Sequence, residues 1–532
     1  MDKHIFYNGR IFTSNPEQPY AEAMVVEAGK IIWIGSNKDI KETAAACTDL
    51  KGKRVLPGFV DAHMHPLFLA NAVKQIACTP PAVNSIDEML QKVMEKRACS
   101  PDNGSWIEGW GYDENKLSEG RSPNRWDLDK ASPDVPVFIM RTCFHIAVVN
   151  SRALQLAGIN KDTPDPAGGK IDRDENGEPT GILRECAKDL VYSMIPKPTM
   201  DVSADNLALL STILLSQGIT SMAECLAETT PEDYYNIYIK AAEKGLKQRV
   251  VLYYQWDQLK KSGRLPVDKR NPENRIFIGG IKIMADGSIS GKTAWIDPPY
   301  FKDENNYGLQ TITCDELLKA ADYAEKNQLQ ISVHAMGEQA IDLVVNTLYV
   351  KNCWLTDKPC IRIDHAAMPT DSAIRKSSEK GFFFVSQPIF IYAEIESYLK
   401  NLGLIRTKKT YPYKHILQSG VKLAFSSDAP ATAWSDPSNP FTAIKAAVTR
   451  VSYDGTDNGR ENALDVETAI CLYTREATEA CGIKGTGILK PGCYADFIIL
   501  DQDILEIGPE EIDSINVSET YINGALVYKN LK

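Results

Sequence analysis

The stretch Val55-Leu-Pro-Gly-Phe-Val-Asp-Ala-His-Met-His-Pro66 is an apolar run that ends in two histidines. His63 and His65 are two positions apart, and side chains with that spacing on a strand point to the same face. At the end of a buried strand, both imidazoles can therefore reach one metal ion, for which imidazole is a common ligand. A bare His-x-His pair is weak evidence on its own, because unrelated core or surface histidines give the same pattern.

Similar apolar, β-branched runs recur along the chain, and helix-like stretches follow several of them. Many are continuous apolar runs, which are typical of strands buried on both faces of a parallel sheet. Eight such strands that alternate with helices predict an α/β fold, a (β/α)8 TIM barrel. The predicted strands are 55–63, 218–225, 248–254, 276–286, 329–335, 361–367, 382–388 and 422–428.

The two ends of the chain differ from its middle, because both consist of short β-rich runs with turn residues such as Asn8-Gly9. We predict one small composite β-sandwich from residues 1–56 and 480–532, beside a barrel of residues 57–70 and 206–479. The gap of about 155 residues between the first two barrel strands is too long for a crossover. Residues 71–205 are therefore predicted to form a large inserted α+β subdomain that covers the active site.

Composition and charge narrow the class of protein. The chain is 43% hydrophobic and 24% charged, as globular proteins are, and its net charge of −11 disfavours a nucleic-acid surface. No apolar run reaches the ~18 residues of a membrane span, and the N-terminus lacks the features of a signal peptide. The 12 scattered cysteines are expected to be reduced thiols in a cytoplasmic protein.

Metal-binding residue types end five of the eight predicted strands, at the edge of a barrel where catalytic groups lie. Four of the chain's 7 histidines fall there, whereas chance placement would scatter them. The candidate ligands are His63, His65, Lys282, His334, His365 and Asp428.

This set exceeds the needs of one tetrahedral zinc with an open position, and it suits a pair of divalent ions. A protonated lysine is a poor neighbour for two dications, whereas Lys282 that has captured carbon dioxide becomes an anionic carbamate able to bridge them. Two alternatives stay open: Lys282 is an ammonium group paired with Asp286, or the site binds a single metal ion. Glu224, at the end of the second strand, is a rival bridging ligand if Lys282 is unmodified.

The chain resembles the amidohydrolase superfamily and, more narrowly, amidohydrolase family 3, the YtcJ-like group that includes N-substituted formamide deformylases. Three residues beside the ligands depart from the usual pattern of the group: Glu338, Asp364 and Ser427. These departures leave the substrate open. Besides the six candidate ligands, the resemblance rests on Arg141 to Leu154, Pro179 to Glu185, Lys282 to Ser288, Val333 to Ala340 and Pro491 to Asp496.

The resemblance implies a metal-dependent hydrolase that cleaves a C–N bond other than a peptide bond, such as that of an N-substituted formamide, by hydroxide attack. It implies two divalent ions, with zinc the expected metal. His63 and His65 would bind the first ion, and His334 and His365 the second. Carboxylated Lys282 would bridge the ions, and Asp428 would bind the first ion and carry the proton.

Four further residues are candidates for substrate binding, although ordinary hydrogen-bonded or packing residues would look the same. They are His145, Glu185, Gln387 and Trp295. Two rival functions stay open, which are ester, lactam or deaminase chemistry on the same site and a catalytically inactive regulatory protein. The expected partner is a small-molecule substrate, with no nucleic acid and no membrane, and a homodimer is expected because dimers are the commonest assembly.

Overall fold

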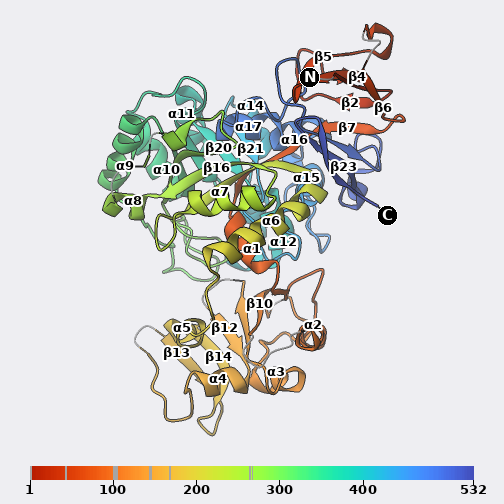
Figure 1. The fold of residues 1–532 in the computed structure, drawn as a ribbon. Coiled ribbons are helices and arrows are strands. Elements are labelled where there is room, and N and C mark those ends of the chain that lie inside the picture. The colour runs from red at the N-terminus through yellow and green to blue at the C-terminus, as the bar shows by residue number, and fades with distance from the viewer. Residues whose placement is uncertain are drawn as a thin grey trace. The chain divides into compact units, whose positions relative to one another are not determined.

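The structure is a computed structural model that describes residues 3–41, 45–99, 106–114, 116–142, 146–166, 169–262, 265–266 and 268–531 (Figure 1). The chain forms two compact units. The first unit comprises Met1–Pro66, Leu207–Ala429 and Ser438–Lys532, and the second comprises Leu67–Asn206 and Pro430–Pro437. The predicted insertion falls within the second unit, and its covering of the active site stays a prediction.

Eight parallel strands form the central sheet of the first unit, and their spatial order follows the chain from β8 to β21. Backbone hydrogen bonds from Asp428 N to the His63 carbonyl (2.7 Å) and from His65 N to the Ala429 carbonyl (2.8 Å) join the two edges of the sheet. The predicted TIM-barrel fold is thereby confirmed. The strands are β8 (Phe59–Met64), β15 (Ile219–Ala227), β16 (Arg249–Gln255), β17 (Ile276–Met284), β18 (Gln330–Ala335), β19 (Ile361–His365), β20 (Phe383–Ser386) and β21 (Lys422–Phe425).

The first apolar run holds two strands, so the single strand predicted over 55–63 is wrong. β7 (Arg54–Pro57) pairs with strands from both ends of the chain, whereas β8 pairs with β15. Gly58 lies between them, and a Cβ there would approach the Thr220 hydroxyl oxygen to 2.3 Å. Only glycine allows the backbone to pass so close at the point where the chain enters the barrel.

The ends of the chain build two further sheets in the first unit, one ordered β5-β4-β1-β6 and the other β24-β23-β22-β7-β2-β3. The second sheet joins strands from both termini, and Phe6, Phe497 and Tyr521 pack in one core. The strands are β1 (His4–Tyr7), β2 (Arg10–Phe12), β3 (Tyr20–Ala21), β4 (Ala23–Glu27), β5 (Lys30–Gly35), β6 (Ala46–Asp49), β22 (Phe497–Leu500), β23 (Val517–Ile522) and β24 (Ala525–Lys529).

Helices alternate with the barrel strands. α9 and α11 each begin after a threonine, Thr313 or Thr370, whose side chain accepts a backbone N–H of the first turn. α6 (Met200–Ser216) begins in the second unit and ends in the first. The other helices of the first unit are α7 (Tyr234–Lys244), α8 (Trp256–Ser262), α9 (Cys314–Asn327), α10 (Glu338–Leu348), α11 (Asp371–Lys380), α12 (Pro388–Ala393), α13 (Ile395–Lys409), α14 (Tyr413–Gln418), α15 (Pro440–Thr449), α16 (Val466–Tyr473) and α17 (Arg475–Cys481).

The second unit is built on a mixed sheet in the order β13-β14-β12-β11-β10-β9, with its own apolar clusters. It is an α+β unit inserted between β8 and β15. Its strands are β9 (Ile76–Ala77), β10 (Ile107–Tyr112), β11 (Val137–Arg141), β12 (Ile146–Val149), β13 (Gly169–Arg173) and β14 (Pro179–Glu185). Its helices are α1 (Pro66–Ala72), α2 (Ile86–Ala98), α3 (Arg125–Ala131), α4 (Ser151–Leu156) and α5 (Cys186–Tyr192).

Cys353 and Cys360 form a disulfide in the connection between α10 and β19. Their Cα atoms are 5.4 Å apart, within the usual range for such a bond. The expectation that every cysteine is a reduced thiol is therefore wrong for this pair, because the fold of the connection brings together two residues that sequence spacing did not mark.

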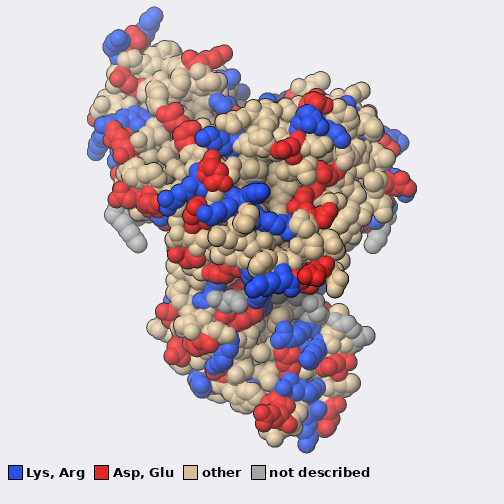
Figure 2. Space-filling model, turned by 180° about the vertical axis from the view of Figure 1, so that it is seen from behind, with Lys and Arg blue, Asp and Glu red and all other residues tan. Residues whose placement is uncertain are grey.

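The face of the molecule drawn in Figure 2 mixes the two signs of charge. On the face drawn in Figure 2, lysine and arginine side chains lie interspersed with aspartate and glutamate side chains. Among the described residues, no helix combines the length and the apolar character needed to cross a membrane.

Candidate functional site

The structure brings the six candidate ligands together at the C-terminal ends of five barrel strands, where each is less than a tenth exposed. The centroid of the His63 imidazole ring lies 5.5 Å from that of His65 and 4.9 Å from that of His365. The His334 and His365 centroids are 4.3 Å apart. Four imidazoles from three different strands thus form one buried cluster.

The carboxylate of Asp428 is the point at which the first two histidines converge. Its Oδ1 lies 2.8 Å from His65 Nε2 and 3.3 Å from His63 Nε2, yet neither contact has hydrogen-bond geometry. Ligand atoms of His63, His365 and Asp428 all lie within 4.8 Å of one another. Metal ligands aim lone pairs at a shared point rather than at one another, so this donor set fits a divalent cation.

Each of the other two histidines has a neighbouring acceptor. His365 Nδ1 lies 2.8 Å from the amide oxygen of Gln387, whose amide nitrogen donates to Ser426 at 2.8 Å. Nδ1 therefore carries the proton, and Nε2 is left as the lone-pair donor. His334 Nε2 lies 3.0 Å from the Gly287 carbonyl and 3.4 Å from Asp286 Oδ1.

Lys282 does not pair with Asp286, so that open alternative is wrong. The lysine amine contacts Asp364 instead. Asp286 accepts three backbone N–H groups, those of Trp295 (3.0 Å), Met336 (3.0 Å) and Gly337 (2.8 Å). Asp286 thereby ties the loop after β17 to the end of β18, next to His334.

A fully buried ion pair beneath the site was missed by sequence reasoning. Arg362 Nε donates to Asp364 Oδ1 at 2.8 Å, and its Nη2 donates to the Ala62 carbonyl at 2.8 Å. Asp364 Oδ2 lies 3.0 Å from His63 Nδ1. Although burial raises the pKa of Asp364, Arg362, Lys282 and His63 hold it well below its usual range. The available signal was the pattern Arg-x-Asp, which places both side chains on the same face of β19.

Arg362→Met is expected to lower the free energy of unfolding by about 3 kcal/mol, because it removes one cation from a carboxylate that stays buried. Urea unfolding of the metal-free protein measures the change. The double variant Arg362→Met with Asp364→Asn should recover most of the loss, since it removes both charges. A single variant as stable as the wild type would contradict the importance of this pair.

Burial sets the protonation of the other site residues. It lowers the pKa of His63, and it lowers that of His365 well below the usual value, so both imidazoles stay neutral, as metal ligands must be. His65 is different: burial lowers its pKa, but Asp428 and Glu224 outweigh this and raise it to about 9. A metal ion must therefore displace a proton from His65 at neutral pH.

Asp61 is a second buried acid that sequence reasoning missed. Its Oδ1 accepts the backbone N–H groups of His63 (3.2 Å) and Ser427 (3.1 Å). Burial raises the pKa of Asp61 to about 7. The carboxyl group thus joins the end of β8 to the segment that carries Asp428.

The backbone is strained at two of the candidate ligands. His365 has φ +72° and Asp428 has φ +56°, in the left-handed region that residues other than glycine rarely adopt. Such strain persists where surrounding contacts enforce it, and it clusters at functional sites. Asp428 is held by its backbone hydrogen bond to His63, three residues beyond the end of β21.

The remaining predicted residues are spread over both units. His145 lies outside the described residues, and Glu185 ends β14, where only its backbone is described. Trp295 is half-buried beside Asp286, and Gln387 is buried behind His365. Glu224 Oε1 lies 3.8 Å from His65 Nδ1, so Glu224 flanks the histidine. The substrate-binding roles of the first four stay predictions.

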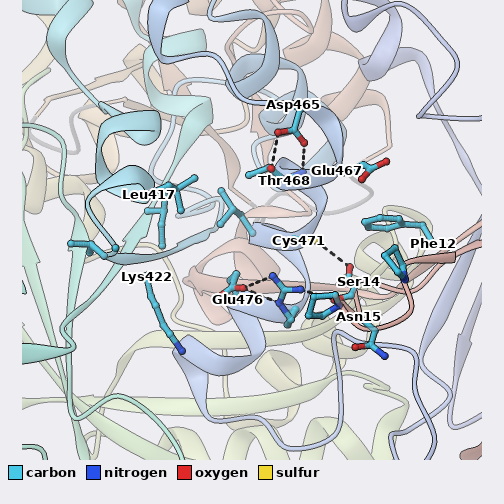
Figure 3. A pocket seen from close by; sticks show the side chains of 17 residues that line it. Phe12, Ser14, Asn15, Leu417, Lys422, Asp465, Glu467, Thr468, Cys471 and Glu476 are labelled. Atoms are coloured by element: carbon cyan, nitrogen blue, oxygen red, sulfur yellow. Dashed lines mark hydrogen bonds and ion pairs between the residues drawn. The ribbon is translucent and has the colours of Figure 1, made fainter. Parts of the chain in front are cut away.

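A separate cavity of about 500 Å³ opens at the other end of β21, where the strand begins at Lys422 (Figure 3). None of the predicted site residues lines it. Four of its polar side chains satisfy one another in pairs: Asp465 accepts from Thr468 at 2.8 Å, and Glu476 accepts from Arg475 at 2.8 Å. The cluster of histidines is therefore the better candidate for chemistry.

Known proteins share this architecture. A sequence model of the amidohydrolase family matches residues 46–528. YtcJ of Bacillus subtilis (strain 168), assigned to the amidohydrolases, is 30% identical over 99% of this chain and 99% of its own length. The N-substituted formamide deformylase of Arthrobacter pascens is 26% identical over 98% of this chain and 97% of its own. The crystal structure of an uncharacterized metal-dependent hydrolase from Pyrococcus horikoshii OT3 matches with a TM-score of 0.74 and 26% identity, covering 96% of this chain and 99% of that one.

Proposed function

Because the chain belongs to the amidohydrolase family, we propose that it is a metal-dependent hydrolase that cleaves an amide-type C–N bond of a small molecule. The observation that carries the proposal is the convergence of His63 and His65 on Asp428, beside His334 and His365. Divalent ions held there would lower the pKa of water and polarise the substrate carbonyl.

We propose that His63, His65 and Asp428 hold one ion and that His334 and His365 hold the second, with zinc as the metal. In this form the Lys282 amine would have captured carbon dioxide and released a proton to solvent, and the resulting carbamate would supply an anionic ligand to both ions. Lys282 would then give up its ion pair with Asp364, which keeps Arg362. A single-ion centre that retains the Lys282 ion pair is the alternative.

Asp428 is proposed to move the proton. Its buried carboxylate, which His63 and His65 keep ionised, would accept a proton from the attacking water and deliver it to the leaving amine. Burial raises the pKa of Asp428, but the two histidines outweigh this and hold it well below its usual range, so it starts as a base. The hydrogen bond that His365 Nδ1 donates to the Gln387 amide oxygen would keep that imidazole in the orientation a ligand needs.

Metal content and a substrate panel test the proposal. Protein purified without chelator should contain two zinc-like ions per chain, whereas the single-ion alternative predicts one. N-substituted formamides are the first substrates to assay, because the Arthrobacter pascens relative is named for them. N-acyl amines, esters, lactams and purines complete the panel and separate the rival chemistries. Metal-loaded protein that hydrolyses none of them would favour the catalytically inactive alternative.

A further inference from the structure

The inserted unit contains an aromatic-lined cavity of about 680 Å³. All of its lining residues belong to that unit. The volume falls within the range of roughly 300–1,000 Å³ that is typical of small-molecule sites. None of the residues assigned to the metal centre lines it, so the cavity requires a separate explanation.

Two parallel strands form an aromatic floor in this cavity. Trp106, Glu108 and Trp110 alternate along β10 and the residue before it, so they share one face. β11 pairs with β10 so that Phe138 lies opposite Glu108 and Met140 opposite Trp110. The floor therefore combines aromatic and thioether groups, which suit a flat aromatic ligand, with a single acid.

Two further rings line the cavity and remain open to solvent. The Phe68 side chain is 48% exposed and Tyr192 is 46% exposed, although both are large and apolar. The Tyr192 ring lies 5.5 Å from the Phe138 ring of the floor. Exposed apolar surface that adjoins a cavity is the kind of surface that a ligand covers.

The cavity also contains a buried acceptor without a partner. Asn206 is 4% exposed, and its Nδ2 donates to Asn71 Oδ1 at 3.1 Å. Its Oδ1 has no hydrogen-bond partner among the described residues. A buried acceptor left in this state is costly, so a donor on a bound ligand would be favoured there.

Glu108 and a neighbouring lysine add to this picture. Glu108 accepts a hydrogen bond from Gln75 at 3.1 Å, and burial raises its pKa. The Lys96 amine donates to the Lys74 carbonyl at 2.6 Å, so it already serves an acceptor of the protein. The cavity thus offers a ligand aromatic faces and the Asn206 acceptor, and Lys74 and Lys197 add cationic groups to its lining.

We propose that this cavity binds a small molecule with an aromatic ring that carries an N–H donor, such as an indole. The ring lies against Trp106, Trp110 and Phe68, and the N–H group donates to Asn206 Oδ1.

Calorimetric titration of the full-length protein with indole and with 1-methylindole tests the binding, because the probes differ in the N–H donor. Indole should bind once per chain and about tenfold more tightly than 1-methylindole, the effect expected of one buried hydrogen bond. Asn206→Leu should abolish this difference, whereas Asn206→Asp, which keeps an acceptor, should retain it. Equal affinity of the wild type for both probes, or no binding of indole, would overturn the proposal.

Phe68→Ala should weaken the binding of both probes about tenfold, since it removes an aromatic contact. Trp126→Ala is the matched control, because Trp126 is a 42% exposed aromatic residue of the same unit that does not line the cavity. An equal loss of affinity in the two variants would overturn the assignment of the cavity.

Discussion

Asp428→Asn is expected to lower turnover by about 100-fold or more while most of the metal stays bound. The asparagine side chain has nearly the same shape as aspartate, and its oxygen can still face His63 and His65. It cannot accept a proton at neutral pH, however, so the transfer from water to the leaving amine is lost. The variant therefore separates proton transfer from metal binding.

Metal content and turnover must be measured on the same sample of this variant. Asp496→Asn is a suitable control, because Asp496 is also a buried aspartate but pairs at 3.1 Å with Arg249, the residue at which barrel strand β16 begins. The control should affect stability and leave turnover per folded molecule unchanged. Near-normal turnover of Asp428→Asn with its metal retained would refute the role of the carboxylate as the proton carrier.

Removal of the metal should abolish most of the activity, with a loss of roughly two orders of magnitude or more, because unassisted water is a poor nucleophile at neutral pH. Dialysis against a chelator, followed by elemental analysis and assay, measures the loss. Zinc, manganese or cobalt added back should restore turnover and identify the preferred ion. Full activity in protein that contains no metal would disprove the mechanism.

Two histidine variants show whether the loss belongs to the proposed centre. His365→Ala should reduce both metal content and turnover, since His365 lies within the cluster. His415→Ala is the control, because His415 is a surface residue that pairs with Asp371 at 3.0 Å. Its metal content and activity should match those of the wild type.

All eight barrel strands were predictable from apolar runs, because strands buried on both faces must be apolar almost throughout. Strand limits were less accurate. The run over 55–63 contains both β7 and β8, and the eighth strand ends at Phe425, three residues before Asp428. Gly58 lies at the break between β7 and β8, but the reason that the position requires glycine is its close approach to Thr220, which is far away in the chain.

The candidate ligands were also visible in the sequence, because their residue types recur at the ends of predicted strands and the C-terminal ends of parallel strands meet at one rim. The contacts around them were not visible. Lys282 pairs with Asp364 rather than Asp286, and Gln387 supports His365. Arg362 was overlooked because a charged residue within an apolar strand has no evident partner until its neighbours are known.

The amino-acid sequence by itself determined the strand pattern, the barrel and the identities of the six candidate ligands, since these depend on residue type and spacing along the chain. The tertiary structure alone decided which buried charges pair, that Cys353 and Cys360 join, and that the inserted unit holds an aromatic cavity with an unsatisfied Asn206 oxygen. These features depend on distances between side chains of different strands and loops. Such distances follow from the register and packing of the whole fold, which local periodicity does not encode.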